Sequence, residues 1–452
     1  MIDILFVFCY LMFPLIIYLL MKANGLSIFK LTIPSFVILC MFAFAYIGTI
    51  VLYFGWDAYR YASGVTDKMI MLNVYGFTTW TIFTLVMGYI FSKNIIGFGS
   101  IKTPSYNLRP LNKKEKRWLF FLLLFCFAIL ALYISKVPRV ALIVAIVDGY
   151  RESKLARSLM GNDFAGKYNR YHLVMHHMLN LVTYVYFANW LYLKKKGAFI
   201  IFLIAFLGAS FAALMATEKG PFAWLLIALF LTYVLVKKDG EISIFASIKL
   251  LLLIIASMVI LYIFFMGSSN IGSGIASVFS RSFTGQIQPA YHYLEFFPAQ
   301  QDFLLGRSFP NPGGILPFEP YRLTVEVMNF KHPELATQAI VGSMPTIFWG
   351  EMYANFGLIG VLVMPFIVGV ALYAISYVLG LMENTPIKVG LLVWAMLHYK
   401  NLVATGLSGF MVDIYLVGIL GVVFLVVMLA NRGKIKYIRH VNKMSDSIVM
   451  KS

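Results

Sequence analysis

The stretch that begins at residue 281 holds side chains suited to the departure of a charged group. Arg281 and His292 flank a segment that contains the amides Gln286 and Gln288. An arginine can stabilise a departing diphosphate, and a histidine can take the proton of an attacking hydroxyl. The alternative is that these residues are ordinary solvated side chains of a loop. The pattern therefore indicates a candidate site and leaves the structural interpretation open.

A second group of cations lies in the segment 136–171. Arg151, Lys154 and Arg157 are three residues apart, so a helix would place them roughly along one face. Such a face suits a phosphate or diphosphate, which the planar guanidinium of arginine can bind through two hydrogen bonds. The alternatives are contact with lipid headgroups, or ion pairs with Asp148 and Glu152.

Other polar clusters have weaker signals. His172 and His176 have the spacing of a metal-binding pair, but no third ligand is near, so we expect no metal. The turn that contains Glu218 and Lys219 fits either an interfacial anchor or part of a site. His398 and Lys400 are expected at the membrane interface. No nucleotide-binding glycine loop or hydrolase serine motif is present, so we expect no cofactor.

The elements that must position these residues are membrane helices. Hydrophobic residues form 61% of the chain and charged residues 12%, far from the balance of soluble domains. Runs of about twenty apolar residues predict an all-α integral membrane protein with about eleven transmembrane helices. The expected spans are 3–21, 32–54, 70–91, 118–135, 173–193, 198–216, 222–236, 248–266, 357–381, 387–400 and 411–430.

Lys and Arg in the loops predict the orientation, because cytoplasmic loops are enriched in them. The segment 93–117 carries seven basic residues and one acidic residue, so we place it in the cytoplasm. The N-terminus is then outside and the C-terminus inside. The net charge of +18 is partly explained by this topology and does not indicate nucleic-acid binding.

The orientation also divides the chain into regions. Residues 1–266 hold eight helices and the outer loop 136–171, which contains the short apolar run 140–147. Residues 267–356 form a long outer loop, and a loop of that length usually has its own structure and function. The last three helices occupy 357–430, and a basic cytoplasmic tail occupies 431–452.

Three local motifs resemble those of the bacterial O-antigen and exopolysaccharide repeat-unit polymerases of the Wzy type. The turn Ala216–Pro221 is similar to a Ser-Arg-Gly turn of that family, although Lys219 stands where the family more often has arginine. Gly306-Arg307-Ser308-Phe309 is similar to its Gly-Arg-aromatic element. Trp349–Gly357 contains Glu-Met-Tyr-Ala-Asn-Phe-Gly, which resembles the start of a helix in the family and is the most specific of the three.

The resemblance implies a GT-C-like glycosyltransferase of the bacterial cytoplasmic (inner) membrane, acting on its outer face. Such an enzyme transfers a glycan, with inversion, from undecaprenyl diphosphate to a second lipid-linked repeat unit, and so builds O-antigen for lipopolysaccharide or a related polysaccharide. Its partners are these substrates, membrane lipid and a possible chain-length regulator. His292 is then the candidate base, with Glu295 and Glu351 in reserve and Arg281 as the catalytic cation. The candidate substrate-binding residues are Arg151, Arg157, Lys219, Arg307 and Arg322.

Two other functions compete with polymerisation. An O-antigen ligase shares the fold and the donor but uses a lipid A core acceptor. A transporter or flippase for lipid-linked oligosaccharide would need ionisable residues at helix midpoints, whereas the predicted spans place almost none there.

Overall fold

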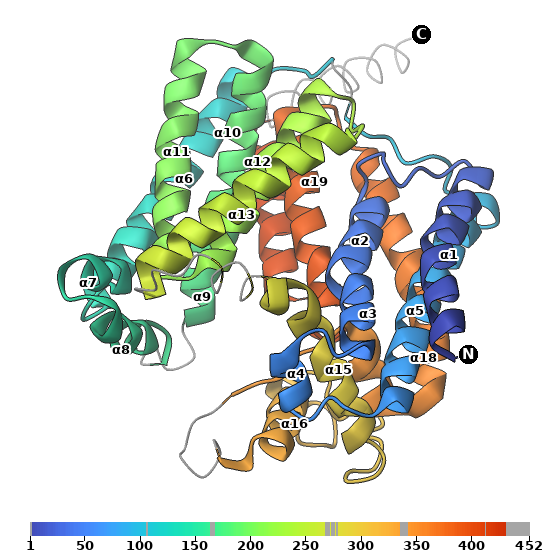
Figure 1. Cartoon of the computed structure of the whole chain (residues 1–452). Helices are drawn as coiled ribbons and strands as arrows, with labels where there is room; N and C mark the ends of the chain where they lie inside the picture. Colours follow the sequence, from blue (N-terminus) through green and yellow to red (C-terminus); the bar gives the residue numbers. More distant parts are fainter. Residues whose placement is uncertain are drawn as a thin grey trace. The chain divides into compact units, whose positions relative to one another are not determined.

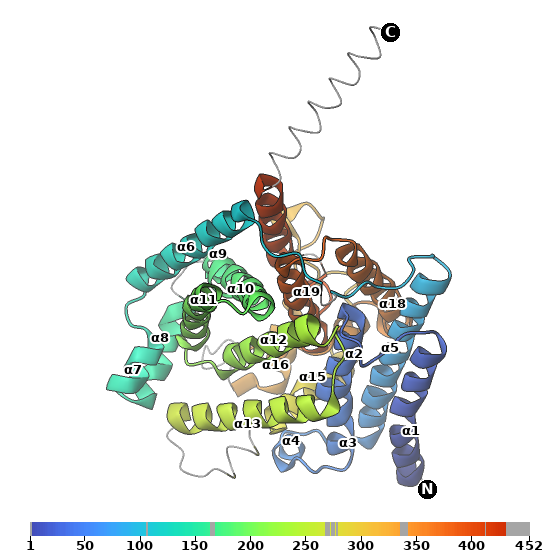
Figure 2. The ribbon, with the colours of Figure 1, turned by 90° about the horizontal axis from the view of Figure 1, so that it is seen from above.

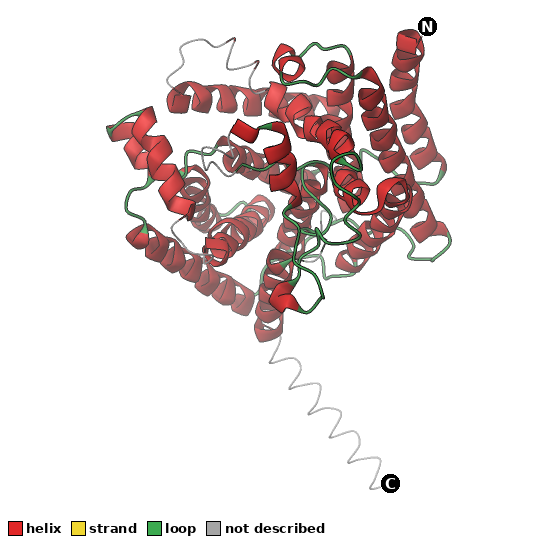
Figure 3. Ribbon diagram, turned by 90° about the horizontal axis from the view of Figure 1, so that it is seen from below, coloured by secondary structure: helices red, strands yellow, loops and turns green. Residues whose placement is uncertain are grey.

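The computed structural model describes residues 2–104, 107–162, 168–266, 272, 276, 279–334, 342–411 and 413–430 of the 452 in the chain. These residues form helices and loops, and their only strand-like pairing is one isolated bridge between Lys30 and Glu241. Figure 3 shows the helical content, with no strand drawn. The prediction of an all-α fold is confirmed for these residues.

Among the described residues, seven helices are long and apolar enough to cross a bilayer. Each coincides with a predicted span, so the chain is a membrane-embedded protein. They are α1 (Ile2–Ala23), the continuous run Ile33–Tyr53, α5 (Lys68–Asn94), α6 (Lys113–Lys136), α11 (Lys196–Leu214), α12 (Lys219–Lys237) and α18 (Phe348–Gly380).

The other four predicted spans also fall on helices, but their crossing stays a prediction. They correspond to α10 (Leu179–Leu193), α13 (Ile244–Met266), α19 (Pro386–Tyr399) and the helix Ile414–Ala430. α18 begins at Phe348, nine residues before the predicted start, and is interrupted at Gly357, whose φ of 58° is not helical. The motif forms the helical segment before this kink, and the predicted span starts at the kink. The predicted tail, 431–452, lies outside the described residues.

The chain divides into two compact units. Unit 1 comprises 1–104, 238–382 and 395–413, and unit 2 comprises 105–237, 383–394 and 414–452. Besides α1, α5, α13 and α18, unit 1 contains α2 (Ile33–Met41), α3 (Ile47–Tyr53), α4 (Ala58–Ala62), α15 (Gly285–Phe296) and α16 (Leu323–Lys331).

α5 and α18 form the most closely packed helix pair of unit 1, and Figures 1 and 2 show them side by side. A Cβ atom on Gly88 would lie 2.5 Å from the carbonyl oxygen of Phe366, and one on Gly369 would lie 2.4 Å from that of Leu85. Glycine at these two positions therefore lets the backbones touch, as small residues do in membrane helix pairs.

Hydrogen bonds show which helix ends of unit 1 share a side. The Tyr53 hydroxyl, at the end of α3, donates to Asp3 at the start of α1 (2.6 Å). At the opposite end, Lys93 of α5 donates to the carbonyl of Asn24, just after α1 (2.6 Å). The Asp67 amide, which precedes α5, donates to the Tyr291 hydroxyl of α15 (2.9 Å). The start of α1 and the segment around α15 thus lie on one side of unit 1.

The segment that holds α15 and α16 has a hydrophobic core of its own. Leu304, Leu323 and Val327 are buried there against Tyr293 of α15 and Ala354 of α18. Such a core is what a structured segment needs and a solvated linker lacks. Its location outside the membrane stays a prediction.

Unit 2 contains a packed group of four helices and two further helices that pack on each other. α10, α11 and α12 pack against one another, and α6 contacts α10 and α11. Unit 2 also contains α7 (Ala141–Val147), α8 (Tyr150–Asn162), α9 (Tyr168–His172) and the helix Ile414–Ala430. α7 packs on α8 and, with seven residues, is too short to span, as the run 140–147 predicted.

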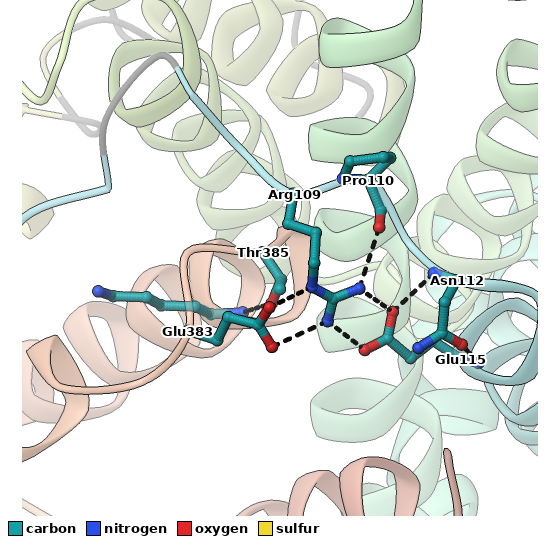
Figure 4. A network of polar contacts seen from close by, with 7 residues as sticks. Arg109, Pro110, Asn112, Glu115, Glu383 and Thr385 are labelled. Atoms are coloured by element: carbon teal, nitrogen blue, oxygen red, sulfur yellow. Dashed lines mark hydrogen bonds and ion pairs between the residues drawn. The ribbon is translucent and has the colours of Figure 1, made fainter. Parts of the chain in front are cut away.

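Arg109 joins two parts of unit 2 (Figure 4). Its guanidinium donates to both oxygens of Glu115, at 2.6 and 3.1 Å, and also binds Glu383. Glu115 lies in the first turn of α6, where it forms a capping box with Asn112. The network therefore holds the start of α6 to the segment that leads into α19.

Candidate functional site

A cleft of about 1120 Å³ lies in unit 1 between the α3–α4 region and the helical turn that precedes α15. Most of its wall is apolar or aromatic, and its polar part comes from Asp57, Arg60, Ser280, Arg281 and Thr284. The apolar residues are Ile47, Val51, Trp56, Tyr59, Phe279 and Phe283. A cleft of this size with few polar groups is typical of a ligand site. We call it the arginine cleft.

Asp57 organises the polar part of the arginine cleft. One carboxylate oxygen caps α4 by accepting from the Arg60 amide (3.4 Å). The other accepts the hydroxyls of Ser280 and Thr284, both at 2.6 Å. Ser280–Thr284 is a π-helical turn, a feature frequent at functional sites. Burial raises the pKa of Asp57, but these hydrogen bonds outweigh it and lower the pKa below its ordinary value, so the carboxylate is ionised.

Arg60 and Arg281 place two positive charges at this cleft. Burial lowers the pKa of Arg60, Asp57 opposes that effect, and the charge of Arg281 adds to it. Arg60 still stays charged, because the ordinary pKa of arginine is far above neutral pH. The Nε of Arg60 has no hydrogen-bond partner among the described residues, and Arg281 is exposed. Two such cations favour an anionic ligand.

A polar chain runs from Arg60 into the core of unit 1. Arg60 donates to the amide oxygen of Gln288, whose nitrogen lies 3.2 Å from Nε2 of His292. Nδ1 of His292 lies 2.7 Å from Glu295. If the amide donates to Nε2, the ring proton is on Nδ1 and points to Glu295.

His292 is fully buried, and burial lowers its pKa although Glu295 opposes this, so the ring is neutral at neutral pH. Its Nε2 faces Gln288, where an acceptor hydroxyl cannot reach it. In this geometry His292 orients Gln288 and, through it, Arg60. This burial does not fit the expected direct role of His292 as base.

The other candidates of the long segment lie together near the start of α18. Glu351 is buried and accepts a hydrogen bond from the hydroxyl of Ser308 (2.9 Å). Ser308 directly follows Arg307 in the chain. Arg307 is exposed and donates to the Leu304 carbonyl, and Arg322 lines a cleft beside Glu351. Two motifs of the resemblance, separated by some forty residues, thus meet in space.

The remaining candidates belong to unit 2. Arg157 of α8 donates to Glu218 (2.8 Å), which precedes Lys219 at the start of α12. Asp148, the expected partner, instead lies 3.8 Å from Arg139. Arg151 is part of α8, but its side chain lies outside what the structure describes. All residues that line the arginine cleft belong to unit 1, so none of these unit 2 candidates takes part in it.

The histidines near the start of α10 contact aromatic rings. No group of three potential ligands that could hold a metal ion occurs among the described residues. His172 and His177 pack on the Tyr415 ring instead, with ring centroids 5.5 and 4.3 Å away. His398 has a buried side chain whose Nε2 lies 3.0 Å from the Phe410 carbonyl oxygen, and its expected position at the membrane interface stays a prediction.

Sequence reasoning missed Asp57 and Arg60. Their segment, between two predicted spans, is on the predicted outer side. An arginine there opposes the charge rule, and that is the signal that could have identified it. No protein-family model matches the chain, and no curated protein or solved structure matches it either.

Proposed function

We propose that the chain is a membrane glycosyltransferase that polymerises undecaprenyl-diphosphate-linked repeat units into a surface polysaccharide. The observation that supports this most is the arginine cleft, where Arg60 and Arg281 stand beside an apolar and aromatic wall. A lipid diphosphate has both properties: an anionic head that binds two guanidinium groups and a hydrocarbon tail that packs on apolar side chains.

In the proposed reaction, the bond between the anomeric carbon and the diphosphate oxygen breaks, and the diphosphate leaves with the electron pair. The hydroxyl of the acceptor sugar forms the new bond from the opposite face and loses its proton. Arg60 and Arg281 stabilise the charge that develops on the diphosphate. Asp57 lies 3.9 Å from Nε of Arg60 and holds that guanidinium in place, and the released proton passes to solvent water.

The test measures polymer length and rate with lipid-linked repeat units isolated from the source bacterium and the purified protein in lipid nanodiscs. Arg281→Ala should reduce the rate per folded molecule about a hundredfold, equivalent to about 3 kcal/mol in the transition state. Arg281→Lys should have an intermediate effect, because lysine keeps the charge but loses the two-pronged geometry.

Lys68→Ala is the matched control, because this exposed cation belongs to unit 1 and lies outside the arginine cleft. Wild-type activity per molecule in Arg281→Ala would remove the arginine from the mechanism. Deletion of the gene should leave single repeat units on the surface glycolipid and abolish long chains. Loss of the single units as well would favour ligation or translocation instead.

A further inference from the structure

A second cleft of about 350 Å³ lies in unit 1 against the first turn of α18. Its size falls within the range of small-molecule sites. It combines a buried carboxylate, hydroxyls and aromatic rings with a single arginine, whereas the arginine cleft has two arginines. We call it the Glu351 cleft, and its principal residues are Ser308, Tyr321, Arg322, Thr346, Glu351 and Ser408.

The floor of the Glu351 cleft is built by two segments that fit together. Glu351 and Asn355 lie one helical turn apart on α18, so both face the turn at 304–308. The Asn355 side chain accepts from the Gly306 amide (2.9 Å) and donates to the Ser308 hydroxyl (2.7 Å). Gly306 has φ of 95°, a conformation that glycine adopts without strain. This docking fixes the Ser308 hydroxyl on Glu351.

Three donors hold the Glu351 carboxylate: the hydroxyl of Ser308, and the hydroxyl and amide of Ser408. A carboxylate has about four acceptor positions, so one stays available to a ligand. Gly406 lies so close that a Cβ atom there would be 2.4 Å from Oε2 of Glu351. The carboxylate is therefore fixed in direction and is only 5% exposed.

Other polar groups at the Glu351 cleft are left for a ligand. The Thr346 hydroxyl is buried and has no hydrogen-bond partner among the described residues, which is unfavourable unless a ligand or water binds it. The exposed Arg322 side chain lines the same cleft, and so do the rings of Tyr321 and Phe410. The cleft thus offers acceptors, donors and apolar ring faces.

We propose that the Glu351 cleft binds hydroxyl groups of a neutral sugar, as the acceptor subsite of the polymerase; this acceptor role rests on the proposed function. A sugar hydroxyl both donates to a carboxylate and accepts from an arginine, and the C–H faces of its ring pack on aromatic side chains. A diphosphate fits poorly, because Glu351 would repel it. A purely apolar ligand would leave the polar groups of the cleft without partners.

The experiment compares two probes on the purified protein in nanodiscs. One is the repeat-unit oligosaccharide released by mild acid from its carrier, which has neither lipid nor phosphate. The other is farnesyl diphosphate, which has the donor's lipid diphosphate but no sugar. Glu351→Gln keeps the size of the side chain but removes its charge, so it should weaken oligosaccharide binding roughly tenfold. Arg322→Ala, at an exposed side chain, should weaken it by a similar factor, and neither should change farnesyl diphosphate binding.

Glu319→Gln is the control, because Glu319 is an exposed carboxylate in the same segment and does not line the cleft. Oligosaccharide binding that survives both Glu351→Gln and Arg322→Ala would overturn the proposal. So would binding that is lost only in Arg281→Ala, since the glycan would then occupy the arginine cleft. The wild-type protein could bind the oligosaccharide, lose that binding in Glu351→Gln and Arg322→Ala, and yet fail to polymerise repeat units. That result would support the sugar site and refute the proposed polymerase.

Discussion

Arg60 depends on the absence of a side chain at the start of α15. A Cβ atom on Gly285 would lie 2.8 Å from Nη2 of Arg60 and 3.1 Å from the Ser280 carbonyl oxygen. The guanidinium therefore occupies the space that any other residue at 285 would fill. Gln288, His292 and Glu295 then fix the other side of Arg60 through their chain of polar contacts. A single position in the sequence thus decides where a proposed catalytic charge lies.

Gly285→Ala should reduce polymerisation on the order of tenfold, because the methyl group displaces the end of Arg60 and small misplacements of a catalytic group are costly. Alanine favours helix over glycine, so the amount of folded protein should not fall. The double variant with Arg60→Ala should be no worse than Arg60→Ala alone, since the effect acts through Arg60.

Gly76→Ala controls for this change, because a Cβ atom on this helical glycine would contact nothing within 4 Å. Additive effects of Gly285→Ala and Arg60→Ala on the rate would show that Gly285 acts by another route.

At the scale of elements, α6 and the segment before α19 are held together by Arg109. Glu115 is only 2% exposed, whereas Glu383 is 63% exposed. The hydrogen bonds with Glu115, followed by those with Glu383, raise the pKa of Arg109 above its ordinary value. The ion pair with Glu115 therefore contributes more to the stability of unit 2 than the pair with Glu383. Water can replace the partner of an exposed carboxylate but not that of a buried one.

Arg109→Ala should therefore destabilise unit 2 by about 1–3 kcal/mol, the cost of leaving a buried acceptor without its donor. Glu383→Ala should cost less, within about 1 kcal/mol, because that pair is exposed. The measurement is thermal unfolding of the purified protein in detergent. Equal loss in the two variants would show that burial of Glu115 does not decide the strength of this network.

For the whole molecule, orientation in the membrane decides whether the two clefts can meet lipid-linked glycans. The Lys and Arg distribution places Ile315 outside and Ser100 inside. In unit 1 both are accessible, since Ile315 is 82% exposed and Ser100 lies in an exposed loop. The charge bias therefore makes a prediction that chemical labelling can test.

In a variant with Cys9, Cys40 and Cys126 replaced by alanine, a membrane-impermeant thiol reagent should label Ile315→Cys in intact spheroplasts. Ser100→Cys should react only after the membrane is permeabilised. The reverse result would put both clefts on the cytoplasmic side and exclude chemistry on the outer face.

The sequence by itself determined the membrane character and the positions of the long apolar helices. Hydrocarbon imposes a length and an absence of charge on every spanning segment, and both can be read directly from the residues of α1, α5 or α6. It also identified Arg281 as a candidate from its place beside polar amides and His292, whereas Glu351 became a candidate through the family resemblance.

Only the tertiary structure decided which polar residues act together. Arg60 and Arg281 are more than two hundred residues apart, and Ser308 meets Glu351 only because a turn docks on α18. His292 has the residue type of a base, yet packing buries it behind Gln288. Periodicity and charge act along the chain, whereas partner, burial and direction depend on contacts between segments that no local pattern records.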